Sequence, residues 1–335
     1  MASVLRSANG DEALGIVGVS MRLAWVTGGR GFLGRHVARQ LHATGWRVIG
    51  VGNGDWSGEE ARSWGLELWC KAEIDLQALE GLAATAGRPD LIFHAVGGGS
   101  VGFSLEWPLA DFQRTVATTA VVLEAARSLA PAALIVYPSS CAVYGMAGKG
   151  PISETTPLAP VSPYGVHKVM AENLCLSGNR HFGLRCAIIR YFSVYGPGLR
   201  KQLLWDLAHK IAANPQEVRL HGTGEETRDF LHAEDAARIV SLVADAARDQ
   251  PLIINGGSGA AVSVRELAEG VAAQLGEQTV IRFTGQSRPG DPPHYQADIS
   301  RLKRLGFTPA WALQDGLRDY VNWLRKADSG LGESG

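Results

Sequence analysis

A glycine-rich turn between an apolar run and an amphipathic stretch constrains the fold of this 335-residue chain more than any other feature. The turn holds Gly28, Gly31 and Gly34, and it directly follows the apolar run 23–27. Gly28 permits a tight turn, Gly31 lets a phosphate approach the backbone, and Gly34 lets a helix pack closely on a strand. Because a helix N-terminus attracts anions, this strand–turn–helix unit predicts a dinucleotide-binding site.

Apolar runs and amphipathic stretches continue to alternate as far as about residue 195. The predicted strands are 23–27, 47–51, 91–95, 133–139 and 187–192, and the predicted helices between them are 32–44, 108–130 and 163–178. Strands that helices cover on both faces are continuously apolar, as these runs are. The pattern therefore predicts an α/β fold with a doubly wound parallel sheet of the Rossmann type.

The alternation loosens after Tyr195-Gly-Pro-Gly198, where shorter predicted helices (203–213, 233–247 and 263–275) are mixed with brief strands and loops. We therefore expect residues 21–195 to form the NAD(P)-binding domain with the catalytic residues, and residues 196–328 to form mainly a smaller, mixed α/β substrate lobe. Residues 1–20 are expected to be an extension outside the fold, with Met1 and Met21 as the alternative start sites, and residues 329–335 a flexible tail.

Composition excludes several classes of protein. With 32 Lys and Arg against 33 Asp and Glu, the net charge is −1, so we expect no nucleic-acid partner and no binding to anionic membranes. No run of 18 apolar residues is present, which excludes a membrane span. The four cysteines show no metal-ligand or disulfide pattern, so we expect no metal site and a cytoplasmic location.

The carboxylate that usually binds the adenosine ribose of NAD is missing from its expected place at the end of the second strand. Gly52 stands there, followed by Asn53 and Asp55, either of which could still reach the ribose. Arg30 and Arg35 lie close enough in sequence to meet the 2′-phosphate of NADP. The cofactor is therefore predicted as NAD or NADP, with NADP slightly favoured.

Tyr164 and Lys168 are four residues apart, which places both side chains on one face of a predicted helix. An ammonium group beside a phenol stabilises the phenolate, so Tyr164 can act as a base towards a hydroxyl group. Ser140, at the end of the fourth predicted strand, is the third candidate, because ligands bind at this end of the strands in open α/β sheets. Ser139 is expected instead to hydrogen-bond backbone groups at the end of this strand.

Four segments together resemble the extended short-chain dehydrogenase/reductase family, in its nucleotide-sugar epimerase/dehydratase branch. They are 27–34, 139–145, Tyr164 with Lys168, and 190–197, and weaker similarity continues in 228–235, 255–259 and 288–298. The resemblance implies that Ser140, Tyr164 and Lys168 are catalytic. It also implies cofactor contacts from Gly28, Arg30, Gly31, Phe32, Leu33, Gly34, Asn53, Ala95, Tyr164, Lys168 and Tyr191.

The resemblance further implies a nucleotide-sugar substrate, with UDP-hexoses favoured. Arg228 and Arg288 would clamp its diphosphate, and Asp291 would lie near the nucleoside. The other expected substrate contacts are Ser100, Ser140 and Ser193. The predicted helices 108–130 and 163–178 would pair with their copies in a homodimer, and segment 145–163 would pass near the substrate.

Within this branch, dehydratases carry two carboxylates where this chain has Cys141 and Ala142, so the residues argue against dehydration. The chain is most similar to the 4-epimerases, which oxidise C4 transiently to a 4-ketose and return the hydride to either face. One alternative is an NADPH-dependent reductase of a 4-keto-6-deoxy nucleotide sugar, which the missing acid at Gly52 favours. A more remote alternative is a non-catalytic nucleotide-binding protein.

Overall fold

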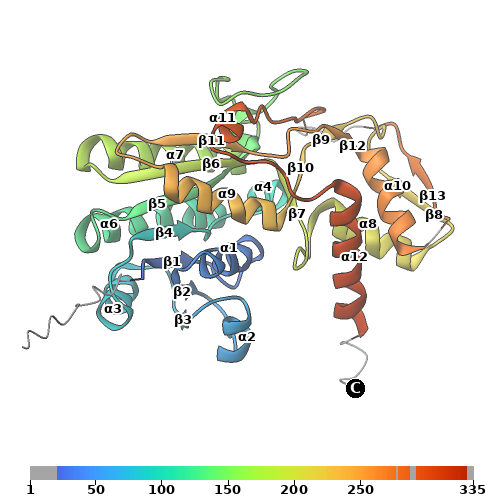
Figure 1. Ribbon diagram of the computed structural model, residues 1–335. Coiled ribbons are helices and arrows are strands. Elements are labelled where there is room, and N and C mark those ends of the chain that lie inside the picture. Colours follow the sequence, from blue (N-terminus) through green and yellow to red (C-terminus); the bar gives the residue numbers. More distant parts are fainter. Residues whose placement is uncertain (1–20, 277, 287–291, 330–335) are drawn as a thin grey trace, which may run out of the picture.

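The computed structural model describes residues 21–276, 278–286 and 292–329. At its centre is a parallel sheet of seven strands in the order β11-β6-β5-β4-β1-β2-β3 (Figure 1). These strands are β1 (Leu23–Thr27), β2 (Arg47–Gly52), β3 (Leu68–Lys71), β4 (Leu91–His94), β5 (Leu134–Ser140), β6 (Arg185–Tyr191) and β11 (Leu252–Gly256). All five strands expected from the sequence are present, which confirms the predicted α/β class. β3 and β11 were not predicted.

The order of the strands reverses beside β1. The chain runs outwards from β1 through β2 to β3, and then returns to place β4 on the opposite side of β1. Ligands of open α/β sheets bind outside the carboxyl ends of the strands at such a reversal. The glycine turn after β1 and the loop after β4 both lie at this edge, so the topology places the candidate site there.

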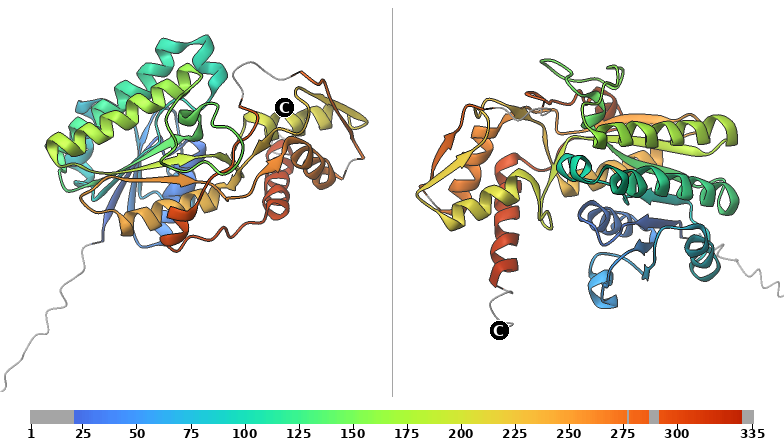
Figure 2. Two further views of the ribbon diagram at one scale, coloured as in Figure 1. Left: turned by 90° about the horizontal axis from the view of Figure 1, so that it is seen from above. Right: turned by 180° about the vertical axis from the view of Figure 1, so that it is seen from behind.

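Helices cover both faces of the sheet (Figure 2). On one face, α1 (Phe32–Ala43) packs against α9 (Ala233–Ala246). On the other face, α6 (Thr118–Leu129) packs against α3 (Leu76–Ala86) and α7 (Pro163–Phe182). Each face has its own buried apolar cluster, the first including Leu41 and Val243, the second including Leu79 and Val122. Burial on both faces explains why the strands are apolar throughout.

The predicted helix 108–130 is wrong as a single α-helix. It consists of α5 (Pro108–Phe112), a π-helical turn (Gln113–Ala117) and α6, and a further short helix, α4 (Val101–Glu106), comes before it. A π-helical turn often marks a functional site. The predicted helix 163–178 ends too early, because α7 continues to Phe182, where Gly183 adopts the left-handed conformation (φ +68°) that ends the helix.

The chain leaves the sheet after β6 and forms the smaller lobe on the right of Figure 1. Three helices, α8 (Gln202–Ala213), α10 (Val264–Leu275) and α12 (Leu313–Ser329), enclose its apolar core together with β8 (Glu217–Leu220) and its partner β13 (Val280–Phe283). Two more strand pairs connect the lobe to the sheet edge. They are β7 (Ser193–Tyr195) with β10 (Phe230–His232), and β9 (Thr227–Arg228) with β12 (Val262–Ser263). Between β10 and β12 in the sequence, the chain comes back to the seven-stranded sheet and forms α9 and β11 there.

The remaining short elements are α2 (Gly58–Ser63), α11 (Ser300–Arg304) and a 3₁₀ turn, η2 (Cys141–Tyr144), that directly follows β5. No helix in the described part of the chain is both long enough and apolar enough to span a bilayer.

Candidate active site

The glycine turn after β1 has the backbone geometry that a phosphate requires. Gly28 adopts φ +68°, and its N–H donates to the carbonyl of Val51 at 2.7 Å. A Cβ at position 34 would lie only 2.3 Å from the carbonyl oxygen of Gly28, so Gly34 cannot be replaced without movement of the turn. Gly31 is the N-cap of α1 and has no side chain to bond the first-turn amides, so no cap side chain blocks the approach of a phosphate to them.

The other predicted cofactor residues around this turn have different environments. Phe32 packs against the apolar core of the lobe and Leu33 against that of the sheet, so both help to position the start of α1. The N–H of Ala95 donates to the carbonyl of Thr27 at 3.1 Å, which aligns the loop after β4 with the glycine turn. Arg30 is exposed.

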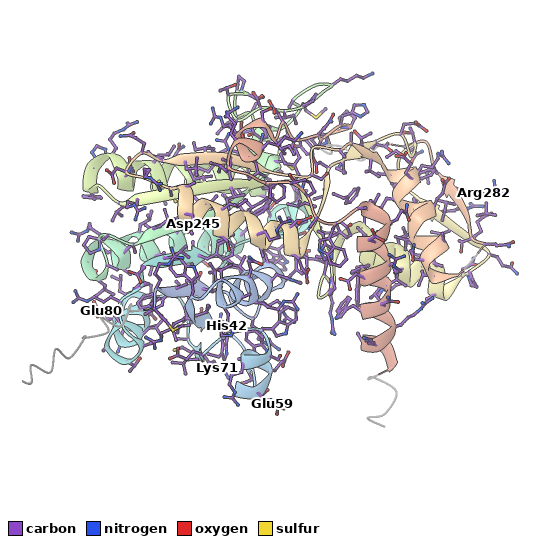
Figure 3. The ribbon with its side chains drawn as sticks, viewed as in Figure 1. His42, Glu59, Lys71, Glu80, Asp245 and Arg282 are labelled. Carbon is purple, nitrogen blue, oxygen red and sulfur yellow. The ribbon has the colours of Figure 1, made fainter. Side chains whose placement is uncertain are left out.

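The end of β2 leaves no room for a ribose-binding acid at position 52. Gly52 has φ +156°, and a Cβ there would lie 3.2 Å from the Trp69 ring. Asp55 pairs with Lys71 at 2.6 Å, at the β3 side of the sheet (Figure 3). This ammonium lowers the pKa of the Asp55 carboxyl. Asn53 is exposed, and the Arg30 guanidinium lies 2.7 Å from where a Cβ of residue 54 would be.

The three predicted catalytic residues come together at the carboxyl ends of β5 and β6. Ser162 caps the N-terminus of α7: its hydroxyl accepts from the N–H of Gly165 at 3.2 Å, so Tyr164 lies in the first turn and Lys168 one turn later. The Lys168 ammonium donates to the carbonyl of Pro138 at 2.9 Å and lies 5.9 Å from the centre of the Tyr164 ring. The Ser140 side chain lies near the Tyr164 phenol and lowers its pKa, against the larger, opposite effect of burial.

Burial shifts the pKa values of this pair in opposite directions. It raises the pKa of Tyr164 to about 12, against the effect of the Ser140 hydroxyl, which lowers it. It lowers the pKa of Lys168 to about 8, against the carboxylates of Asp111 and Glu172, which raise it. A cationic Lys168 beside a phenol favours the phenolate. The residues present can therefore hold and move a proton at the Tyr164 oxygen.

A buried network behind this group holds it in place. The Ser139 hydroxyl donates to the Glu172 carboxylate at 2.5 Å, so its partner is this side chain rather than the backbone at the strand end. The guanidinium of Arg190 binds the same carboxylate and also the hydroxyl of Tyr144. Tyr144 in turn donates to the side chain of Asn255 at 2.7 Å. The network thus links β5, β6, α7 and β11.

Three hydrogen bonds hold the loop after β4 in place. The N–H of Gly98 donates to the hydroxyl of Thr115, in the π-helical turn, at 2.8 Å. The ammonium of Lys201, which precedes α8, donates to the carbonyl of Gly99 at 3.2 Å. Ser100, a predicted substrate residue, is the N-cap of α4 and accepts from the N–H of Phe103. These contacts fix a glycine-rich segment beside Lys168.

Only some of the predicted substrate residues can be placed relative to the site. Ser193 and Arg228 are both half-buried, on β7 and β9, and the charge of Arg228 acts on the Cys141 thiol beside Ser140. Arg288 and Asp291 lie outside the described residues. Tyr191, a predicted cofactor residue, is buried, and its hydroxyl donates to the carbonyl of Ala236 in α9 at 2.8 Å.

Sequence reasoning missed Asp111, His167, Lys201 and Glu172. The π-helical turn brings α5 over α7, so Asp111 meets His167 at 2.6 Å although the two are far apart in sequence. The one available signal was the histidine inside the Tyr164–Lys168 motif. Within the part of the chain that the structure describes, no cluster of three or more His, Cys, Asp or Glu side chains could hold a metal ion.

The family model described as "NAD dependent epimerase/dehydratase family" matches residues 24–257. The chain belongs to this family. This confirms the resemblance seen in the sequence and, with it, the predicted enzyme class, an NAD(P)-dependent epimerase or reductase.

Relatives cover almost the whole chain. The UDP-glucose 4-epimerase of Azospirillum brasilense is 30% identical over 92% of this chain and 94% of its own length. The structure of a UDP-glucose 4-epimerase from Thermus thermophilus in complex with NAD superposes with a TM-score of 0.81, at 27% identity over 92% of this chain and all of that one. A dTDP-glucose 4,6-dehydratase of Streptomyces niveus is 32% identical over 64% of each chain.

Proposed function

We propose that this protein is an NAD(P)-dependent 4-epimerase of nucleotide sugars, with a UDP-hexose as the favoured substrate. One observation supports it most: Ser140, Tyr164 and Lys168 lie together at the carboxyl end of β5, and the two residues directly after Ser140 carry no carboxylate. This group can remove and return one hydroxyl proton. Cys141 and Ala142, which directly follow Ser140, do not provide the second acid and base that dehydration needs.

In the proposed reaction, Tyr164 takes the proton from the C4 hydroxyl while Ser140 hydrogen-bonds to the same oxygen. A bound nicotinamide would supply the hydride acceptor for C4 and the hydride donor for the return step. Lys168 keeps the Tyr164 phenolate stable and binds the nicotinamide ribose. After the 4-ketose has rotated to present its opposite face, Tyr164 gives the proton back. Because the hydride also returns to C4, the reaction has no net redox change.

The side chains after Ser140 argue against a dehydratase. Burial raises the pKa of the Cys141 thiol to about 12, so this group stays protonated at neutral pH and cannot accept a proton from a sugar carbon. Ala142 has no titratable group. We therefore place this chain with the epimerases of its family rather than with a dehydratase relative.

A second candidate is an NADPH-dependent reductase of a 4-keto-6-deoxy nucleotide sugar, and the end of β2 is the observation that favours it. The carboxylate of Asp55 forms an ion pair with the ammonium of Lys71, and the Arg30 guanidinium lies close to Gly54. This replaces the usual acid with a cation near the adenosine ribose, an arrangement suited to a 2′-phosphate.

The cofactor that the protein carries after purification separates the two candidates. Denaturing the protein and resolving the released NAD⁺, NADH, NADP⁺ and NADPH should yield tightly held NAD⁺ in near-equal amount if it is an epimerase. An empty site that binds NADPH reversibly would contradict the epimerase and favour the reductase. A protein that holds a nucleotide but converts none of the UDP-hexoses, UDP-N-acetylhexosamines or 4-keto-6-deoxy sugars would support the non-catalytic alternative.

We also propose that the enzyme is a homodimer that works in the cytoplasm. Apolar side chains are exposed on adjoining helices α4, α5 and α7; they are Leu105, Leu109, Phe112, Val166 and Met170. A second copy of this face would cover them, as expected for helices 108–130 and 163–178. All four cysteines are unpaired, which suits a reducing compartment.

A further inference from the structure

Asp111 and His167 form a buried pair directly behind Lys168. The Nδ1 of His167 lies 2.6 Å from Oδ2 of Asp111, and the Asp111 side chain is completely buried. His167 precedes Lys168 on α7, and the ring of Phe112 packs edge-on against its imidazole at 5.6 Å. Because a carboxylate only accepts hydrogen bonds, Nδ1 carries the proton and donates it. The reaction proposed above uses neither residue.

The second oxygen of Asp111 has no hydrogen-bond partner, although it is buried. A Cβ on Gly98 would lie 1.8 Å from this oxygen, and a Cβ on Gly97 would lie 3.7 Å from the Lys168 ammonium. The oxygen and the ammonium therefore lie against neighbouring residues of one loop. A buried carboxylate oxygen without a donor is costly unless a cation compensates it.

The other carboxylate near Lys168 is already neutralised. Both oxygens of Glu172 bind the guanidinium of Arg190, and one also accepts from Ser139. Asp111 has only the imidazole of His167 as a donor. Among the described residues, Asp111 is therefore the carboxylate whose charge is left to balance Lys168.

The titratable groups that face Asp111 and Lys168 come from α5, α7, β5, the segment before α8, and β4, where burial and then Lys168 lower the pKa of His94. Asp111, from α5, raises the pKa of Lys168 more than any other group, ahead of Glu172 and Cys175 on α7. Lys201, before α8, lowers it. Asp111 also raises the pKa of Tyr164 and that of the buried phenol of Tyr137 on β5. One negative charge thus acts on both members of the Tyr164–Lys168 pair.

We propose that Asp111 is a positioning residue whose charge, held in place by His167, keeps Lys168 as an ammonium ion during the reaction. This inference rests on the proposed epimerase function and adds a residue to it. Asp111 acts through Lys168 and does not touch the reacting atoms. The position of the Asp111 carboxylate explains why residue 98 must be glycine, since any side chain there would displace this carboxylate.

The test is the pH dependence of kcat in the holoenzyme and in Asp111→Asn, which keeps the shape but removes the charge. Loss of a negative charge lowers the pKa of both Tyr164 and Lys168, so the acidic and basic limbs should both move to lower pH, by about one unit. Activity at the basic limb should fall about tenfold for that shift. A merely structural role would instead scale activity by one factor at every pH, and that result would overturn the proposal.

Two further variants act as controls. His167→Gln keeps an N–H donor for Asp111 and should leave both limbs in place; movement of the limbs equal to that in Asp111→Asn would overturn the role given to Asp111. Asp235→Asn removes another fully buried carboxylate, whose partners are Arg238 and the amides of Ala310 and Trp311. It should not move the profile. Asp111→Ser replaces Asp111→Asn if the latter does not fold.

A readout without turnover separates this inference from the proposed function. Carbon-13 NMR of the Lys168 Cε, assigned with Lys168→Arg, reports the pKa of this ammonium group in the cofactor-loaded protein. A lower pKa in Asp111→Asn supports the inference even if no nucleotide sugar is epimerised, in which case only the proposed function fails. An unchanged pKa contradicts the inference even if the enzyme is an epimerase.

Discussion

On the sheet side of the candidate site, Tyr164 and Lys168 stand on a helix of 20 residues, and the buried ion pair of Glu172 and Arg190 lies behind them. On the lobe side, Ser193 and Arg228 stand on strands of three and two residues and are only half-buried. The proposed catalytic residues thus stand on a long helix backed by a buried ion pair, and the proposed substrate residues stand on short, half-buried strands. This difference suits a family whose members share one redox step but act on different sugars.

The largest effect is expected on the sheet side. Tyr164→Phe removes the proposed base and should lower kcat about 10³-fold, the usual contribution of a general acid–base group, while cofactor binding stays nearly unchanged. The matched control is Tyr137→Phe, because the hydroxyl of this buried tyrosine has no hydrogen-bond partner. Steady-state kinetics and cofactor titration measure both variants. Substantial residual activity in Tyr164→Phe would remove Tyr164 from its role.

The network behind the catalytic group should be the most sensitive point for stability. Glu172→Gln leaves the buried guanidinium of Arg190 without its counter-ion and should lower the free energy of unfolding by about 3–5 kcal/mol. Denaturation in urea measures it. On the lobe, Glu217→Gln breaks exposed pairs with Arg219 and Arg282 and should cause no measurable change. Equal losses in the two variants would mean that the two regions are held alike.

On the lobe side, the expected effect is on binding. Arg228→Ala would remove the charge-assisted contact that we propose for the diphosphate, and should raise KM for the nucleotide sugar about tenfold, with kcat within about threefold. Arg228→Lys should recover part of the loss. Arg282→Ala, at the far edge of the lobe (Figure 3), is the control. A fall in kcat with KM constant would place Arg228 in the chemistry instead.

The effect that is smallest at neutral pH concerns acid stability beneath the site. Burial lowers the pKa of His94 to about 3, so the folded protein keeps this ring neutral while the unfolded chain protonates it below about pH 6.5. Stability should therefore fall as the pH drops from 6.5 towards 3. His94→Gln, which can still bond the Thr27 and Thr118 hydroxyls, should flatten this slope. An unchanged slope would show that other groups cause it.

The sequence indicated the central strands and the Tyr164–Lys168 pair because both are local patterns, a continuous apolar run and a fixed spacing on one helix. It did not indicate β3, a four-residue edge strand with exposed ends. Nor did it indicate β11, which joins the sheet 61 residues after β6 ends, counted from 191 to 252. The Asp111–His167 pair depends on a π-helical turn, which has no reliable sequence signal.

The central claim is that hydride leaves C4 of a nucleotide sugar and returns to the same carbon. The most direct test is to incubate the purified protein with UDP-galactose carrying deuterium at C4, without added cofactor, and to analyse the product by NMR and mass spectrometry. The account predicts UDP-glucose that retains the deuterium at C4. Conversion with loss of the label, or no conversion alongside NADPH-dependent reduction of a 4-keto-6-deoxy nucleotide sugar, would contradict it.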